Sequence, residues 1–238
     1  MHRFFALPLD EGRALLSPEE SAHAMKVLRM HQGDHCQALL NGDIFSAQIA
    51  QCGEQVILKL GDKLPSPEAS VRITLYQGLP KGDKMEWIAQ KCTEAGVFRI
   101  VPVLFSRCVT KWEKKDDEKK LPRWQRIAAE AAKQSGRSIL PEIAPPMTLK
   151  QLCAQLPHHD LSLVPWEDQM GNGVRNQFSG QKDIAIVIGP EGGIDASEVE
   201  QLQAAGAIPV TLGPRIFRTE TAGLAAIISL LTLSGDME

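Results

Sequence analysis

The chain of 238 residues is long enough for one or two domains, at about 150 residues per domain. Hydrophobic residues make up 43% of it and charged residues 23%, which excludes a wholly disordered chain. The net charge of −3 excludes a protein that would bind nucleic acid through bulk charge alone, although residues 107–137 hold ten basic residues against five acidic ones and form a local basic segment.

The first residues and the longest apolar run exclude two kinds of membrane-directed segment. Residues 1–10 contain no long apolar core, so we expect no secretory signal. The apolar run at 222–233 is shorter than the roughly 20 residues that a membrane span needs, which favours a buried helix. Five cysteines, an odd number without a C-x-x-C pair, predict reduced thiols in a cytoplasmic protein.

Residues 1–68 have the pattern of a small β-rich domain. Asn41, Gly42 and Asp43 separate two apolar runs, which is typical of a hairpin. Ser17 and Glu20 have the spacing of a capping box and predict a short helix that carries His23 to Arg29. The proline-rich run around residues 64–67 predicts the domain boundary. The predicted strands cover residues 37–40, 44–50 and 55–60.

Residues 71–238 alternate between strand and helix patterns. Such alternation predicts an α/β domain with a mainly parallel sheet. The second predicted helix, which we expect to begin at Pro122, has an apolar stripe of Trp124, Ile127, Ala128 and Ala131. The basic segment at 107–137 is interpreted either as a contact with RNA phosphates or as a solvated helix face with an exposed Lys-rich loop at 111–120. The predicted strands are 71–77, 98–104, 161–164, 184–188 and 208–212, and the predicted helices are 83–94, 122–135, 195–204 and 219–233.

A glycine-rich loop follows the apolar strand at 184–188. At the carboxyl end of a parallel strand, glycines let backbone amides approach a ligand closely. Glu191 would repel an anion, and no Lys, Ser or Thr stands where a phosphate loop needs it, so a hydroxyl or a cation suits this loop better. A purely structural tight turn stays open as the alternative. The loop consists of Gly189, Pro190, Glu191, Gly192 and Gly193.

A second loop of the same design, residues 213–218, follows the strand at 208–212. Thr219 is the expected N-cap of the next helix, and Glu220 is favourable in its first turn. That helix is apolar on nearly all sides, which predicts burial in a core or in a subunit interface. For Arg218 two interpretations stay open: an ion pair with Glu220 or another carboxylate, or a cation that serves a bound ligand.

The two loops together resemble the SPOUT superfamily of S-adenosylmethionine-dependent RNA methyltransferases. The resemblance rests on residues 189–193 followed by residues 212–222, and the second motif is long enough to be specific. More narrowly, the chain resembles the bacterial 16S ribosomal RNA uracil-N3 methyltransferases, also called the small subunit methyltransferase E family. Further matching stretches are 23–29, 33–34, 86–94 with Gly96, Arg107, 123–130 and 134–137.

The resemblance implies an architecture and a cofactor. Residues 71–238 would form a trefoil-knotted methyltransferase domain and residues 1–68 a PUA-like β-barrel domain that binds RNA. Members of the family act as homodimers, and here the substrate would be 16S rRNA, within the 30S subunit. S-adenosylmethionine would bind in the knot loops, with residues 164–167 as a further contact. Its binding residues would be Gly189, Pro190, Glu191, Gly192, Gly193, Leu212, Gly213, Ile216 and Phe217.

Methylation of uracil N3 removes a proton and builds negative charge on the flanking carbonyl oxygens, so a cation aimed at those oxygens would favour the transition state. Arg218 is the first candidate for that cation, followed by Arg137 and Arg107. Glu220 either accepts the proton or orients Arg218. For contacts with RNA phosphates we expect Arg3, Lys26 and Arg29 together with the basic segment.

Other functions fit the pattern less well. A metal site is not expected, because His158, His159 and Asp160 are adjacent and no cysteine stands at ligand spacing. The glycine loop lacks the G-x-G-x-x-G spacing of nicotinamide-binding enzymes. Two alternatives stay open: a methyltransferase for another RNA, and a non-enzymatic RNA-binding protein. The second alternative would leave the two glycine loops unexplained.

Overall fold

The structure, a computed structural model, describes residues 1–237, which divide into two units. The first unit is made of Met1–Glu68 and Lys133–Ile139, and the second of Ala69–Ala132 and the chain from Leu140 onward. A cut of the chain into two continuous pieces therefore separates residues 133–139 from the unit with which they pack. These residues include the last turn of helix α3 (Lys114–Ser135).

The first unit is built on a closed barrel of five strands in the order β1-β2-β5-β4-β3. Alternate residues of each strand point inward, and Phe4, Leu16, Ile49 and Leu58 are fully buried in its core. The hairpin at Asn41 is confirmed, because β3 and β4 pair antiparallel. The strands are β1 (Arg3–Asp10), β2 (Arg13–Leu16), β3 (His35–Leu40), β4 (Asp43–Gln51) and β5 (Ile57–Leu64).

The predicted N-cap of the short helix is confirmed. The Ser17 hydroxyl accepts a hydrogen bond from the backbone N–H of Glu20 at 3.1 Å. The helix α1 (Pro18–Ala22) continues directly into a π-helical turn, η1 (His23–Val27). The sequence pattern did not predict β1 and β2, because the second half of β1 is exposed on both faces and β2 has only four residues.

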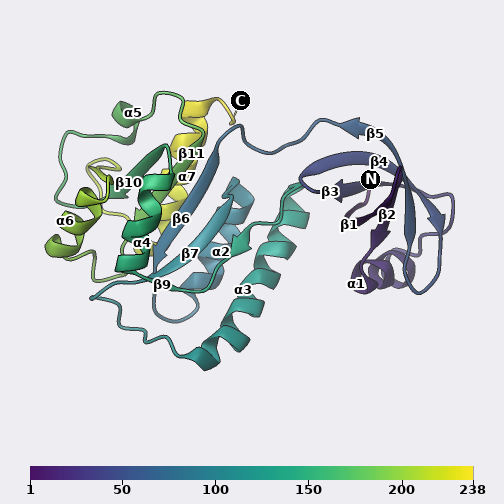
Figure 1. The fold of residues 1–238 in the computed structure, drawn as a ribbon, viewed down its shortest axis with the longest axis horizontal. Helices are drawn as coiled ribbons and strands as arrows, with labels where there is room; N and C mark the ends of the chain where they lie inside the picture. Colours follow the sequence, from purple (N-terminus) through teal and green to yellow (C-terminus); the bar gives the residue numbers. More distant parts are fainter. Residues whose placement is uncertain (238) are drawn as a thin grey trace. The chain divides into compact units, whose positions relative to one another are not determined.

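The second unit holds a parallel sheet of order β12-β10-β11-β6-β7-β8, in which β9 also pairs with β7 (Figure 1). The expected α/β class and parallel sheet are confirmed, and observed strands differ from the predicted ones by one or two residues at most of their ends. The strands are β6 (Arg72–Gly78), β7 (Arg99–Leu104), β8 (Glu142–Ile143), β9 (Met147–Thr148), β10 (Leu161–Pro165), β11 (Asp183–Ile188) and β12 (Ile208–Val210).

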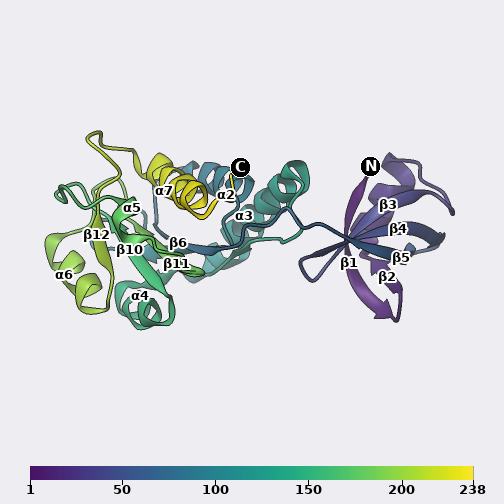
Figure 2. The ribbon, with the colours of Figure 1, turned by 90° about the horizontal axis from the view of Figure 1, so that it is seen from above.

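Helices cover both faces of this sheet (Figure 2). Apolar residues of α2, α3 and α7 form one buried cluster with one face of the strands, and those of α4 and α6 form another with the opposite face. The helices are α2 (Lys84–Ala95), α4 (Leu149–Gln155) with η2 (Leu156–His158), α5 (Val174–Gln177), α6 (Ala196–Ala204) and α7 (Thr219–Ser234).

The predicted start of the helix at Pro122 is wrong, because α3 begins at Lys114 and contains Pro122 inside it. The apolar stripe starts only at Trp124, so hydrophobic periodicity could not reveal the polar first turns. The interpretation of residues 111–120 as a loop therefore fails from Lys114 onward. Among residues 1–237, no helix is long and apolar enough to cross a membrane, and the cysteines are unpaired.

Candidate active site

A pocket of about 980 Å³ lies where the carboxyl ends of β10, β11 and β12 meet. Its wall consists of the ends of these strands and the segments that follow them, the first residues of α7, and Lys84 at the start of α2. Open parallel sheets bind ligands at this edge, and the volume is at the upper end of the range for small-molecule sites. The pocket belongs entirely to the second unit.

The glycine-rich loop packs so closely that side chains have no room at several positions. A Cβ on Gly189 would lie 2.8 Å from Cγ1 of Ile194, and a Cβ on Gly78, the last residue of β6, would lie 2.4 Å from the backbone nitrogen of Pro190. Gly193 has a φ of +72°, which favours glycine. The glycines therefore bring bare backbone to the wall of the pocket.

Glu191 does not face the pocket as an unpaired charge. Its Oε1 accepts hydrogen bonds from Nζ of Lys84 at 2.9 Å and from the backbone N–H of Lys81 at 3.0 Å. Partial burial works against ionisation, but these hydrogen bonds outweigh it and lower the pKa of the Glu191 carboxyl. Lys84 thus places a cation of the protein itself beside Glu191, and the expectation that this loop suits a hydroxyl or a cationic ligand stays a prediction.

Arg107 holds the other end of the glycine-rich loop. Its guanidinium donates to the carbonyl oxygen of Gly192 at 3.2 Å and to Oδ2 of Asp195 at 2.8 Å. Asp195 is the N-cap of α6, and hydrogen bonds from Ser197 and then from Arg107 lower its pKa. Arg107 therefore links the loop to the helix that follows it.

The expectation that Thr219 caps α7 is wrong. The N-cap is Arg218, which uses no side-chain cap, and Thr219 is the first helical residue. Its hydroxyl donates to the carbonyl oxygen of Gly189 at 2.6 Å and accepts from Nε2 of Gln77 at 2.9 Å. Thr219 is buried. Instead of capping α7, its hydroxyl joins the start of this helix to the glycine-rich loop and to β6.

Arg218 and Glu220 both line the pocket but do not pair with each other. Oε2 of Glu220 lies 3.4 Å from Nζ of Lys84, which also binds Glu191. The Arg218 side chain is exposed, and the structure records no hydrogen bond or ion pair between it and another described residue. Among the described residues, the interpretation of Arg218 as the ion-pair partner of Glu220 or another carboxylate is thus wrong.

Most residues expected to bind the cofactor line this pocket; Gly192 does not, and is fixed instead by Arg107. Lys84 was missed by the sequence analysis. It is the first residue of α2, where the helix dipole disfavours a cation, and a lysine at such a position could have indicated a function. The predicted residues that line the pocket are Gly189, Pro190, Glu191, Gly193, Leu212, Gly213, Ile216 and Phe217.

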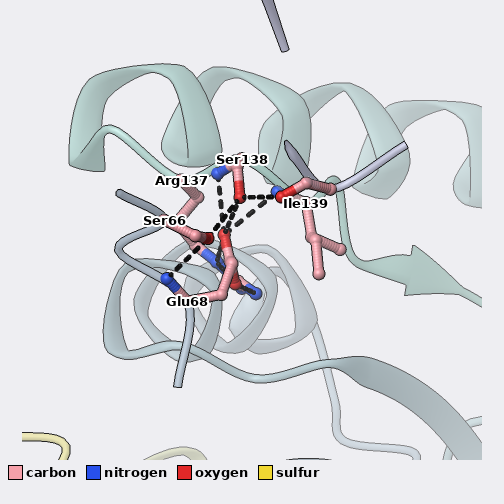
Figure 3. Close-up of polar contacts among 6 residues, drawn as sticks. Ser66, Glu68, Arg137, Ser138 and Ile139 are labelled. Atoms are coloured by element: carbon pink, nitrogen blue, oxygen red, sulfur yellow. Dashed lines mark hydrogen bonds and ion pairs between the residues drawn. The ribbon is translucent and has the colours of Figure 1, made fainter. Parts of the chain in front are cut away.

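Arg137 lies in the first unit, in a buried polar cluster with Glu68 (Figure 3). It is only 6% exposed, and its Nη2 lies 2.6 Å from Oε2 of Glu68. The other carboxylate oxygen of Glu68 accepts from the backbone N–H groups of Ser138 and Ile139 at 2.7 and 3.0 Å. Glu68 thus holds the segment that follows α3 in the first unit.

The three residues expected to bind RNA have different environments in the first unit. Arg3 donates to the Gln37 side chain at 2.6 Å and to the carbonyl oxygen of Gly136. Lys26 and Arg29 are exposed, and Arg29 has a φ of +54°, a conformation that is uncommon outside glycine. Among residues 1–237, no group of three or more His, Cys, Asp or Glu side chains is arranged to hold a metal ion.

Comparison with known proteins identifies the family. The RNA methyltransferase domain family matches residues 67–231. The ribosomal RNA small subunit methyltransferase E of Bacillus subtilis (strain 168) is 35% identical over 231 residues, covering 90% of this chain and 88% of the relative. The chain therefore belongs to the ribosomal RNA small subunit methyltransferase E family.

Two solved structures of similar sequence contain the cofactor. The small subunit methyltransferase E of Neisseria gonorrhoeae, described as bound to S-adenosyl methionine, has a TM-score of 0.83 and 29% identity, with 98% of each chain covered. A methyltransferase from Legionella pneumophila, described as in complex with the same cofactor, has a TM-score of 0.82 and 32% identity, covering 97% of this chain and 96% of the other.

The pocket of this chain fits S-adenosylmethionine, the cofactor of its family. Bare backbone at Gly189 and Gly193 can approach a polar ligand closely, and apolar side chains of Leu212 and Phe217 stand on the opposite loop. The barrel and parallel sheet also agree with the small subunit methyltransferase E structures. The chain is therefore an RNA methyltransferase that uses this cofactor.

Proposed function

We propose that this protein methylates N3 of a uridine in 16S rRNA, and that its substrate is the RNA within the 30S subunit. One observation carries the proposal: Arg218, an exposed cation, and Glu220, a carboxylate whose Oε2 lies 3.4 Å from Nζ of Lys84, both stand at the wall of the cofactor pocket. A base that presents a weakly acidic N–H between two carbonyl oxygens needs both kinds of group.

The proposed roles follow from where these groups lie. S-adenosylmethionine supplies an electrophilic methyl group, so the new N3–C bond forms as the C–S bond breaks and the N3 proton leaves. The Glu220 carboxylate accepts that proton, and its pairing with Lys84 rather than Arg218 supports this role over that of orienting Arg218. Arg218 donates hydrogen bonds to the adjacent carbonyl oxygen as negative charge builds there.

The other two arginine candidates receive supporting roles in this proposal. Arg107 positions the glycine-rich loop through Gly192, since its guanidinium is already used by that carbonyl and by Asp195. Arg137 stabilises the first unit, because it is buried and its charge is matched by Glu68. We assign neither of them to the reacting base.

RNA contact is proposed for the first unit, through Lys26 and Arg29, whose side chains are exposed. Arg3 has a structural role in this proposal, because it already binds Gln37 and Gly136. The expected homodimer is also kept, since α7 is apolar on nearly all sides and leaves Ile228 39% exposed. The trefoil knot and a cytoplasmic location remain part of the proposal.

The deciding experiment incubates 30S subunits that lack the modification with the protein and labelled S-adenosylmethionine, followed by mass-spectrometric analysis of 16S rRNA nucleosides. We expect label in 3-methyluridine. Cofactor binding by calorimetry without label in this nucleoside would contradict the uridine-N3 assignment and favour another RNA. Neither label nor cofactor binding would favour a non-enzymatic RNA-binding protein.

A further inference from the structure

A second hollow of about 580 Å³ lies beside the cofactor pocket, on the side of α2 and the start of α7. It shares three residues with the cofactor pocket, Lys84, Arg218 and Glu220. These are the residues to which the proposed function gives the proton transfer and the charge stabilisation. Its other lining residues are Asp83, Trp87 and Thr221.

Trp87 is the aromatic group of this hollow. It lies three residues after Lys84 on α2, so both side chains project from the same side of the helix. Trp87 is 38% exposed, so a sizeable part of this large aromatic residue is open to solvent. Exposed aromatic faces beside cations are what proteins use to stack unpaired RNA bases.

We propose that this Trp87 hollow holds the target uracil, stacked on Trp87 with its N3 edge toward Glu220 and Arg218. The inference rests on the proposed function and adds the place of the acceptor base. N3 lies on the Watson–Crick edge, so a paired base must leave its stack before it can react, and a stacking partner on the protein replaces part of the lost stacking. Lys84 then stands between the two carboxylates of Glu191 and Glu220, at the boundary of the cofactor and base sites.

The competing occupant of the Trp87 hollow is a second copy of this chain. Ile228 of the neighbouring helix α7 is exposed to a similar degree, so an apolar interface over α2 and α7 is the alternative. The lining favours the base, because Asp83, Lys84, Arg218 and Glu220 are charged and the centres of protein interfaces are depleted of charge.

The test compares Trp87→Ala and Trp87→Phe with wild type in the 30S methylation assay, and Ile228→Ala, on the α7 face proposed for the homodimer, serves as the variant that reports on an interface between copies. We expect Trp87→Ala to raise KM for 30S subunits at least about tenfold, as the loss of one stacked base predicts. Trp87→Phe should restore KM to within a few fold of wild type, because it keeps an aromatic face. The affinity for S-adenosylmethionine, by calorimetry, should stay unchanged in both variants, and so should the melting temperature.

Three results would overturn the inference while leaving the proposed function intact. The first is wild-type KM in Trp87→Ala, and the second is a phenylalanine variant as poor as the alanine variant. The third is loss of activity together with dimer dissociation in light scattering, shared by Ile228→Ala, which would assign the hollow to an interface between copies. A wild-type protein that binds the cofactor but forms no 3-methyluridine would overturn the proposed function itself, and the uracil site with it.

Discussion

The surroundings of Arg218 and Arg137 differ more than their sequence contexts do. Both arginines belong to motifs shared with the family, and both were candidates for the same catalytic role. Arg218 is exposed at the wall of the cofactor pocket, at the start of α7, whereas Arg137 is buried and bound to Glu68 in the first unit. An arginine that has a matched carboxylate stabilises a fold, and one that has none is available to a ligand.

The largest expected effect comes from Arg137→Ala. Removing one partner of a buried ion pair leaves Glu68 charged and unpaired, so we expect the free energy of unfolding to fall by about 3–5 kcal/mol. Urea denaturation measures this. Arg218→Ala is the control and should change stability by less than about 0.5 kcal/mol, because its side chain is exposed. Equal stability of wild type and Arg137→Ala would contradict the structural role that we assign to Arg137.

Arg218→Ala should have the largest effect on catalysis. We expect kcat to fall by about 10²–10³-fold, the usual result of removing one donor that stabilises transition-state charge. Single-turnover methylation of 30S subunits measures the chemical step, and calorimetry should show unchanged cofactor affinity. Arg218→Lys should recover part of the rate, since it keeps the charge but not the planar donor geometry. A normal kcat in the alanine variant would remove Arg218 from the mechanism.

Thr219→Val tests whether the contact between the start of α7 and the glycine-rich loop positions the pocket. The change leaves Nε2 of Gln77 and the carbonyl oxygen of Gly189 without one buried partner each, at a cost of about 1–3 kcal/mol in unfolding free energy. Because Gly189 lines the pocket, cofactor affinity should also fall. Thr219→Ser keeps the hydroxyl and should behave as wild type in both measurements. Normal cofactor affinity in Thr219→Val would show that Thr219 does not position the glycine-rich loop.

Arg107→Ala should have the smallest effect. Its bonds to Gly192 and Asp195 are about half exposed, so the loss of stability should stay below about 1 kcal/mol. Since the bond to Gly192 fixes the pocket loop, we expect cofactor affinity to fall a few fold. Arg126→Ala, which removes a largely exposed ion pair with Glu130, is the matched control and should leave affinity unchanged. A loss of kcat without a loss of affinity would instead place Arg107 at the reacting base.

The parallel sheet and the two pocket loops could be predicted from the sequence, because buried apolar runs followed by glycines mark the carboxyl ends of strands. Most of the predicted residues that line the pocket follow from the same signal. A lysine at the start of a predicted helix could have marked Lys84 as unusual, but its pairing with Glu191 and Glu220 could not be predicted, because these residues lie far apart in the chain. The structural role of Arg137 was hidden for the same reason, since Glu68 lies 69 residues before it.

The discontinuity of the first unit limits how this barrel can be exchanged between proteins. A recombination event or an engineered graft that transfers residues 1–68 alone would transfer Glu68 without Arg137, and Arg3 without the carbonyl of Gly136. Such a fragment would contain the hydrophobic core of the barrel, but its Glu68 carboxylate would lack the guanidinium of Arg137. A transfer that keeps these contacts must therefore include residues 133–139 together with the barrel.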